Sequence, residues 1–449
     1  MSSESNGGRQ SVPNANGVTE KPIESGDHVV FRKINDASVC RLLKVERNAD
    51  IYLGRQRYNV NSVIGAHFGS IFELDAKTKC MKRSDLNEEQ LKQLLKSQLP
   101  ADEEDEDKEE TKDNRFIVDD GQSQKLSKEV IETLKDEGVT GEKIIETLIE
   151  NSSSFKMKTS FSQEKYLKKK HQKYLNFIRV YKPNPALLTE MYYAQNPRKI
   201  NNLRIDTISQ MLCLCNVRSG SKYMVVDTCM GLVTASIVDR LVGDGSVVAS
   251  GYDPGVCIQI FLEQGPASTW RQAVEALNLS PEILDSCLCS IQINKVNEIQ
   301  KQGETEKEQI MNFESEELDN ETDSVKRRKL DEKIERKIKR LREEEKAKQI
   351  LKEKKMDALL IITRNYDPEN ILNLLIEFLA PSRPLAIFSY FAEPLVKCYH
   401  SLKEKAINVK ITETWLRRYQ VLPSRTRPDM NMSSNGGYLL TAIKIDSHN

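Results

Sequence analysis

Metal-binding cysteine spacings are missing from the sequence. The chain has nine cysteines and five histidines. Its two close cysteine pairs, Cys213/Cys215 and Cys287/Cys289, have one intervening residue instead of the two typical of zinc sites. On apolar helices or strands such cysteines are usually small core residues. We therefore expect no metal site and a protein of a reducing compartment.

Net charge and long apolar runs are also lacking. The 67 basic and 67 acidic residues cancel, but they are segregated: Ala101–Glu110 is acidic, whereas Lys165–Lys173 and Lys326–Arg342 are basic. Local fields will therefore decide which partners bind. No apolar stretch approaches the roughly 18–20 residues of a membrane span, and the polar N-terminus lacks the apolar core of a signal peptide. We expect neither a membrane segment nor a secretion signal.

Common catalytic constellations are absent as well. The sequence offers no supported Ser/His/Asp or Cys/His set for nucleophilic catalysis. It also has no G-K-[ST] loop for cradling phosphates. These absences argue against a triad hydrolase and against a P-loop nucleotidase.

The stretch Tyr223–Gly255 organises what is present. Met224–Val226 predicts a short strand, Leu232–Leu241 an amphipathic helix, and Ser246–Ala249 the start of a second strand. Strand, tight loop, helix and strand form a βαβ unit, which is the opening module of a nucleotide-binding doubly wound sheet.

The loop inside this unit differs from that of an active methyltransferase. Such a loop needs an acid followed by alternating glycines, because a Cβ would hold the cofactor away from the backbone. Here Asp227 is followed by Cys229, Gly231 and Val233, so side chains stand at both outer glycine positions. Asp253, the acid near the second strand, belongs to a Tyr-Asp-Pro-Gly turn. We therefore predict a filled loop that binds no cofactor.

The chain of 449 residues divides into several segments. Short β-type runs predict a small barrel, and alternating strands and helices predict a parallel sheet. The expected fold class is α/β, with a small N-terminal β-barrel followed by a degenerate Rossmann-like methyltransferase domain that carries a charged insertion. The expected segments are a disordered tail (1–25), the barrel (26–80), an acidic linker (81–112), a helical, basic RNA-binding connector (113–180), the first part of the α/β domain (181–296), the insertion (297–355) and the second part of the α/β domain (356–446).

The charged insertion has few apolar residues. Sparse Ile334, Ile338 and Leu341 permit a solvent-exposed helix, and the pattern indicates no core, so we expect a disordered segment or a helix looped out of the sheet. Lys326–Lys329 reads Lys-Arg-Arg-Lys, which is typical of nuclear import signals. Such tetrads also occur by chance in charged stretches, so a nuclear location is an expectation with an open alternative.

Two further stretches have the composition of RNA-binding surfaces. Phe161–Tyr174 carries five lysines and one glutamate among tyrosines, which suits phosphate neutralisation and stacking on bases. The alternative is a solvated helix face. Trp415–Gln420 couples two arginines to two aromatic residues, and here a buried tryptophan flanked by surface arginines is the alternative.

Several long motifs, in a consistent order, resemble one family. They are D-N-R-F-I-V-D-D-G-Q-S-Q-K-L (Asp113–Leu126), K-Y-L-K-K-K-H-Q-K-Y (Lys165–Tyr174), M-Y-Y-A-Q-N-P-R-K-I-N (Met191–Asn201), T-C-M-G-L-V (Thr228–Val233), A-P-S-R-P (Ala380–Pro384), E-T-W-L-R-R-Y-Q-V-L-P (Glu413–Pro423) and G-G-Y-L-L (Gly436–Leu440). Together they are similar to the non-catalytic, RNA-binding subunit of the eukaryotic tRNA (adenine-58-N1) methyltransferase. From the residues alone, Asp113–Leu126 is equally explained as a capping loop before a helix.

The resemblance implies a tetramer of two such subunits with two catalytic, S-adenosylmethionine-binding subunits. It also implies a chain that itself binds no cofactor and contacts tRNA. The implied tRNA-binding residues are Asn114, Arg115, Asp119, Asp120, Ser123, Gln124, Lys165, Tyr166, Lys168, Lys169, Lys170, Lys173, Tyr174, Arg198, Lys199, Asn201, Asn202, Arg383, Trp415, Arg417, Arg418, Tyr419 and Gln420. Two other functions stay open at this point: an active S-adenosylmethionine-dependent RNA methyltransferase with an unusual loop, and an RNA-binding scaffold without a methyltransferase partner.

Overall fold

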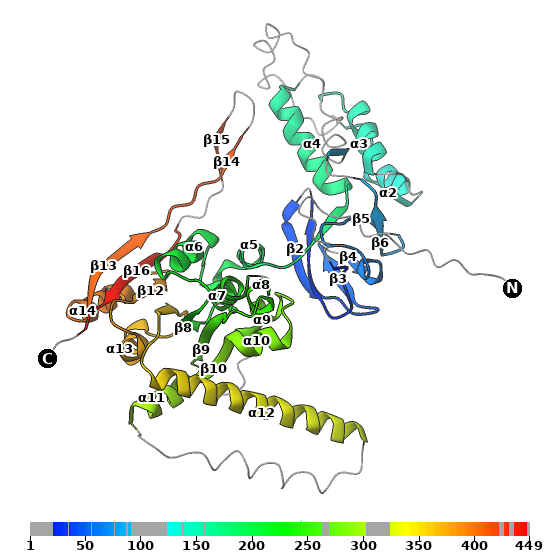
Figure 1. The fold of residues 1–449 in the computed structure, drawn as a ribbon. Coiled ribbons are helices and arrows are strands. Elements are labelled where there is room, and N and C mark those ends of the chain that lie inside the picture. Colours follow the sequence, from blue (N-terminus) through cyan, green and yellow to red (C-terminus); the bar gives the residue numbers. More distant parts are fainter. Residues whose placement is uncertain are drawn as a thin grey trace. The chain divides into compact units, whose positions relative to one another are not determined.

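The computed structural model divides the chain into two compact units, Met1–Lys182 and Pro183–Asn449 (Figure 1). The described residues are 21–34, 36–54, 56–75, 77–86, 89–90, 124–136, 139, 141–155, 158–243, 245–262, 269–301, 324–421, 426–430 and 435–446. The expected tail (1–25) and acidic linker (81–112) lie mostly outside these ranges.

The first unit is built on a barrel-like, seven-stranded sheet. Its strands are β1 (His28–Lys33), β2 (Asp36–Lys44), β3 (Asp50–Leu53), β4 (Gln56–Asn59), β5 (Ile71–Asp75), β6 (Cys80–Ser84) and β7 (Phe177–Tyr181), in the order β2-β1-β7-β5-β6-β4-β3, with a short 3-10 turn η1 (Asn61–Val63). Alternating residues such as Val29, Phe31 and Phe72 are buried on the inner face. The prediction of a small barrel is confirmed.

The boundary predicted for the barrel at residue 80 is wrong, because the last strand comes almost 100 residues later in the chain. β7 pairs antiparallel with both β1 and β5, and its Ile178 and Val180 belong to the barrel core. Residues 113–180 are therefore not a connector outside the barrel. The helices between β6 and β7 belong to the same unit as the sheet.

Three helices cover one side of this unit (Figure 1). They are α2 (Lys128–Asp136), α3 (Gly141–Glu150) and α4 (Ser160–Tyr174). The side chain of Thr159 caps α4 by accepting a bond from the Ser162 amide. Apolar side chains of α3 and α4, among them Ile145 and Leu167, pack with Phe177 of β7 in a second buried cluster. This packing fixes α4 to the sheet.

The second unit is a doubly wound sheet with helices on its faces. Its strands are β8 (Ser221–Asp227), β9 (Gly255–Phe261), β10 (Leu288–Gln292), β11 (Ala358–Ile362), β12 (Pro384–Ser389), β13 (Ala406–Glu413) and β16 (Tyr438–Lys444), in the order β10-β9-β8-β11-β12-β16-β13. The first five in this order are parallel, whereas β16 runs antiparallel to β12 and β13. β8 lies between β9 and β11, where the direction of strand addition reverses, and ligands of such sheets bind at this point.

The remaining described elements of the second unit are mostly short helices, one long helix (α12) and one small ribbon. They are α5 (Pro185–Gln195), η4 (Pro197–Ile200), α6 (Ile205–Leu214), α7 (Leu232–Val242), α8 (Ser246–Ala249), α9 (Arg271–Glu275), α10 (Pro281–Cys287), α11 (Ile293–Lys301), α12 (Ser324–Lys352), α13 (Pro368–Leu375), η5 (Ile376–Phe378), α14 (Glu393–Leu402), and the ribbon β14 (Tyr419–Gln420) and β15 (Arg427–Pro428). The strand predicted at Ser246–Ala249 is wrong: these residues form the helical turn α8, and the second strand of the βαβ unit begins at Gly255. Four apolar or small residues fit a single turn as well as a strand.

The charged insertion is not excluded from the core, which corrects the prediction of a looped-out segment. Its helix α12 packs against β10, and Ala347 and Leu351 are fully buried in the main core of the unit. Glu343 accepts bonds from Arg271 (2.5 Å) and Ser290 (2.8 Å). The sequence concealed this contact because, among the side chains of α12 that the structure describes (334–352), the buried apolar ones are Ala347 and Leu351 in its last turns.

Two further findings concern membranes and cysteines. In the parts of the chain that the structure describes, no helix combines the length and the apolar character needed to span a bilayer. The thiols of Cys215, Cys287 and Cys289 form no disulfide and are buried, whereas that of Cys213 forms none and is exposed. Within the same described ranges no cluster of His, Cys, Asp or Glu has the arrangement of a metal site.

Candidate nucleic-acid interface

The loop after β8 is held closed by one buried carboxylate. Asp227 is 3% exposed, and its two oxygens accept bonds from the backbone amides of Cys229 (2.6 Å), Val233 (2.8 Å) and Thr234 (3.1 Å). Burial raises the pKa of Asp227, and the bonds from these amides oppose that rise. The acid expected to face a cofactor is therefore used to bind its own loop to the start of α7.

Side chains and backbone occupy the space beside this loop. Cys229 and Val233, which stand at the outer glycine positions, are fully buried. Gly231 has φ +75°, and a Cβ added to it would collide with the carbonyl oxygen of Trp270, which is itself buried. The Ala273 amide also bonds to the Met230 carbonyl at 3.3 Å. The residues of this loop therefore do not fit the approach of S-adenosylmethionine to the backbone, in agreement with the predicted filling.

Asp253 does not stand in for a cofactor-binding acid. It precedes β9 instead of following it, and its carboxylate accepts a bond from the Gly255 amide at 2.9 Å. This is the turn that the Tyr-Asp-Pro-Gly sequence predicted.

One face of α4 presents a row of lysines to solvent. Lys165, Lys168, Lys169 and Lys173 are exposed, and their spacing of three, four and eight residues places them on the same side of a helix. Thr159 caps the start of this helix, and the buried Leu167 packs on the side opposite the lysines. Such a row can neutralise successive phosphates.

The aromatic residues of α4 are not available as predicted. Tyr174 is 6% exposed and belongs to the buried cluster, so its predicted stacking on RNA is wrong. Tyr166 is half-buried: its ring lies 5.5 Å from that of Phe155 and 4.9 Å from the Lys170 ammonium. Because Tyr166 and Tyr174 are eight residues apart, about two helical turns, both rings lie on the inner side of α4, where their apolar parts pack well.

The segment before α2 is only partly described. Asn114, Arg115, Asp119, Asp120 and Ser123 lie outside the described residues. Gln124 is half-buried, and its amide nitrogen donates to the Leu148 carbonyl at 3.0 Å. This side chain joins the segment to α3.

The turn η4 in the second unit exposes two cations. Arg198 and Lys199 are exposed, and the Lys199 ammonium lies 5.8 Å from the centre of the Tyr192 ring. Asn201 and Asn202 both have φ of 54°, a left-handed conformation that asparagine tolerates. The side-chain amide of Asn201 donates a hydrogen bond to the Thr363 carbonyl at 3.1 Å, which ties the turn to the end of β11.

An exposed arm leaves the sheet between β13 and β16. We call residues Trp415–Val421, which include β14, the outgoing part of the arm; β15 pairs with β14 through Tyr419–Pro428 and Gln420–Arg427. Trp415 is 77% exposed, so the alternative of a buried tryptophan is excluded. The Arg417 guanidinium lies 6.0 Å from the ring centres of both Trp415 and Tyr419. Arg418 is exposed, whereas Gln420 is half-buried.

Arg383 is exposed but paired. It forms an ion pair with Asp357 at 3.1 Å, with 46% of its side chain accessible. The pair ties the loop before β12 to the start of β11. Its surface position keeps the pair weak, so that Arg383 can exchange Asp357 for a phosphate.

A buried arginine that the sequence did not single out fixes the root of the arm. Arg204, 5% exposed, donates to the Thr414 carbonyl (2.9 Å) and hydroxyl (3.2 Å), and its charge is balanced by Asp206 at 2.8 Å. Thr207 also contacts the Thr414 hydroxyl at 3.0 Å. A Cβ on Gly436 would meet the Arg204 guanidinium and the Thr414 carbonyl at 2.5 Å. Arg204 therefore connects the turn η4 with both strand ends from which the arm extends.

These features define a class of protein. The strand order is that of a methyltransferase-like doubly wound sheet, its switch-point loop is filled by its own residues, and cations and aromatic rings are exposed elsewhere. The chain belongs to the Gcd10p family, whose model matches residues 22–326.

Related sequences align with this chain over nearly its whole length. The chain is 34% identical over 474 aligned positions to the mouse (Mus musculus) tRNA (adenine(58)-N(1))-methyltransferase non-catalytic subunit TRM6, covering 95% of this chain and 89% of the mouse protein. It is 33% identical to the Dictyostelium discoideum protein of the same name, covering 95% and 80%. Among solved structures, a SAM-dependent O-methyltransferase from Thermotoga maritima has a TM-score of 0.47 at 12% identity, covering 95% and 96%.

The filled loop makes a prediction for Gly231. Gly231→Ala adds a Cβ that collides with the Trp270 backbone at a left-handed φ, so we expect the free energy of unfolding to fall by roughly 3 kcal/mol or more. The control is Gly251→Ala, which has the same φ of 75° but an open environment and should cost about 1–2 kcal/mol. Denaturant unfolding of both variants measures the difference; equal losses would show that the loop is open.

The root of the arm makes a second prediction. Arg204→Met removes the bonds to Thr414, and we expect the arm to reorient more freely. The chain has two tryptophans, so a Trp270→Phe background leaves Trp415 as the single reporter of fluorescence anisotropy. The anisotropy should fall in Arg204→Met and only partly recover in Arg204→Lys, because lysine lacks the planar fork. An unchanged anisotropy would contradict the role of Arg204, and an exposed-site control is Arg240→Met.

Proposed function

We propose that this chain is the non-catalytic subunit of a tRNA (adenine-58-N1) methyltransferase, in which it holds the tRNA. The relatives are named as non-catalytic subunits, and this supports a non-catalytic role for the present chain. The observation in this chain that supports it best is the loop after β8, where Asp227 binds its own backbone and Trp270 closes the approach to Gly231. A scaffold of this type without a cofactor site can still bind substrate for a partner.

The proposal divides the reaction between two chains. Base chemistry on a folded tRNA requires that the target adenine is exposed while the body of the RNA is held. We assign the holding to the lysine face of α4, the turn η4 and the arm, and we assign S-adenosylmethionine and the reacting base to a catalytic partner subunit. We further propose a heterotetramer of two copies of each subunit, and a nuclear location based on the basic tetrad Lys326–Lys329.

The division of labour predicts that neither chain is sufficient alone. Co-expression of this chain with a candidate catalytic subunit should yield methyl transfer to unmodified tRNA, and each chain alone should yield none. Titration calorimetry of the isolated chain with S-adenosylmethionine should show no binding. Micromolar binding, or methyl transfer by this chain alone, would instead support an active enzyme with an unusual loop.

The lysine face of α4 predicts a specific loss of tRNA affinity. Lys165→Gln, Lys168→Gln and Lys169→Gln together should weaken tRNA binding by the complex about tenfold at moderate salt. The slope of log affinity against log salt should flatten by about 2–3, because three phosphate contacts are lost. The control, Lys77→Gln with Lys79→Gln and Arg83→Gln, removes the same charge from exposed positions of the barrel. Equal behaviour of the two triple variants would remove α4 from the interface.

A further inference from the structure

The helix α12 has two halves of different character. In its C-terminal half, Glu343 bonds to Arg271 and Ser290, and Glu344 pairs with Lys295 at 2.5 Å. Ala347 and Leu351 are buried in the sheet core. This half is held by packing and by paired charges.

The described residues just before it are strongly basic. The stretch 334–342 contains one acid, Glu335, and five bases, and all five bases are exposed. We call these five the basic ridge: Arg336, Lys337, Lys339, Arg340 and Arg342. Glu343 and Glu344 are partly buried and pair with residues of the fold, whereas the side chains of the ridge are exposed, and one of them, Lys339, pairs with Asp285.

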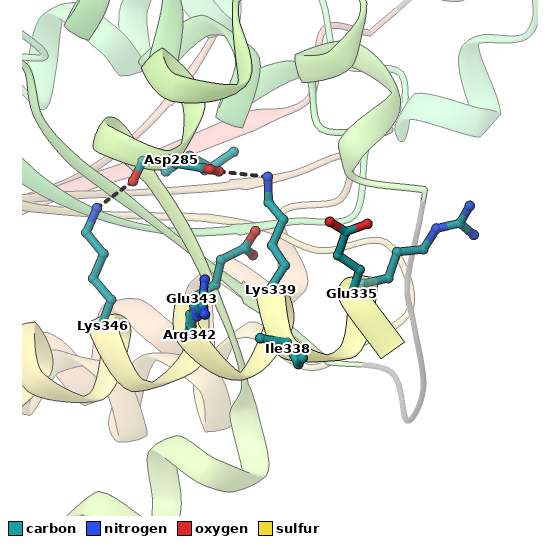
Figure 2. A pocket seen from close by; sticks show the side chains of 9 residues that line it. Asp285, Glu335, Ile338, Lys339, Arg342, Glu343 and Lys346 are labelled. Carbon is teal, nitrogen blue, oxygen red and sulfur yellow. Dashed lines mark hydrogen bonds and ion pairs between the residues drawn. The ribbon is translucent and has the colours of Figure 1, made fainter. Parts of the chain in front are cut away.

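Two lysines of α12 hold the helix beside α10, as Figure 2 shows. The Lys346 ammonium donates to the carbonyl oxygens of Asp285 and Ser286, both at 2.8 Å, and Lys339 pairs with the Asp285 carboxylate at 2.8 Å. Both lysines therefore bind α12 to the end of α10. Beside them lies a groove of about 750 Å³ between α10 and α12, which Arg342 also lines. A preorganised row of cations loses less conformational entropy on binding than a flexible basic tail.

We infer that the basic ridge of α12 is an additional binding surface for the phosphate backbone of RNA. At 1.5 Å per residue, positions 336 to 342 span about 9 Å, a length over which a nucleic-acid strand presents several phosphates. The three arginines of the ridge, Arg336, Arg340 and Arg342, add planar forks that match phosphate oxygens. The basic tetrad Lys326–Lys329, whose pattern is typical of nuclear import signals, lies earlier in the same helix, so the ridge is a separate feature. The inference extends the proposed function to an element that none of the tRNA motifs includes.

The test is made on the complex with the catalytic subunit and on full-length tRNA. Lys337→Gln, Arg340→Gln and Arg342→Gln together keep helix propensity and leave the contacts of Lys339 and Lys346 intact. We expect tRNA affinity to fall about five- to tenfold and the salt slope to flatten by about 2–3. The matched control is Lys352→Gln, Lys355→Gln and Lys397→Gln, which removes three exposed charges elsewhere in the unit.

The outcomes separate this inference from the proposed function. If the unchanged complex fails to bind tRNA, the proposed function is wrong. If that complex binds and the ridge variant binds as tightly as the control, the ridge is not an RNA surface. The inference also fails if the ridge variant keeps full affinity but is lost from the nucleus, because the ridge would then extend the import signal. Neutralisation of the ridge by the acidic stretch 302–323 would likewise leave affinity unchanged and overturn the inference.

Discussion

The second unit depends on the hydrogen bonds that the carboxylate of Asp227 accepts from the backbone of its own loop. Asp227 ends β8 at the switch point of the sheet and satisfies amides at the start of α7. In a sheet of this type the same position faces a ligand, so one buried acid can serve a cofactor or its own loop. Here it serves the loop, and the surrounding side chains pack against it. The central βαβ unit is thereby held together by its own residues.

The candidate interface is spread over elements that differ in how they are held. α4 is capped and packed on a sheet, η4 is tied to the end of β11, and the arm is fixed at its root by Arg204. In each case an exposed cation stands a few residues from a buried anchor. The buried anchor fixes the backbone position of each exposed cation, while the cationic side chain itself stays flexible. This arrangement favours electrostatic recognition of a large folded polyanion such as RNA.

The sequence predicted the fold class, the filled loop and the exposure of four of the five lysines on α4 correctly, because each depends on local patterns; the fifth, Lys170, is half-buried. It misassigned Tyr174, since an aromatic residue among lysines fits both a stacking surface and the inner side of a helix. It missed Arg204, because a buried arginine has no local pattern and is recognised only when Thr414, more than 200 residues away, is brought beside it. It also missed the packing of α12 against the sheet, because the two buried residues Ala347 and Leu351 stand within a strongly charged helix.

The late arrival of β7 in the barrel sheet has a consequence for how this protein can be divided. A fragment that stops after β6 would leave β1 and β5 with unsatisfied backbone groups along the edges that β7 covers. The smallest autonomous N-terminal piece therefore extends to Lys182 and includes the helices. Gain or loss of the barrel and of the basic helix during gene rearrangement would consequently occur together, as a single evolutionary module.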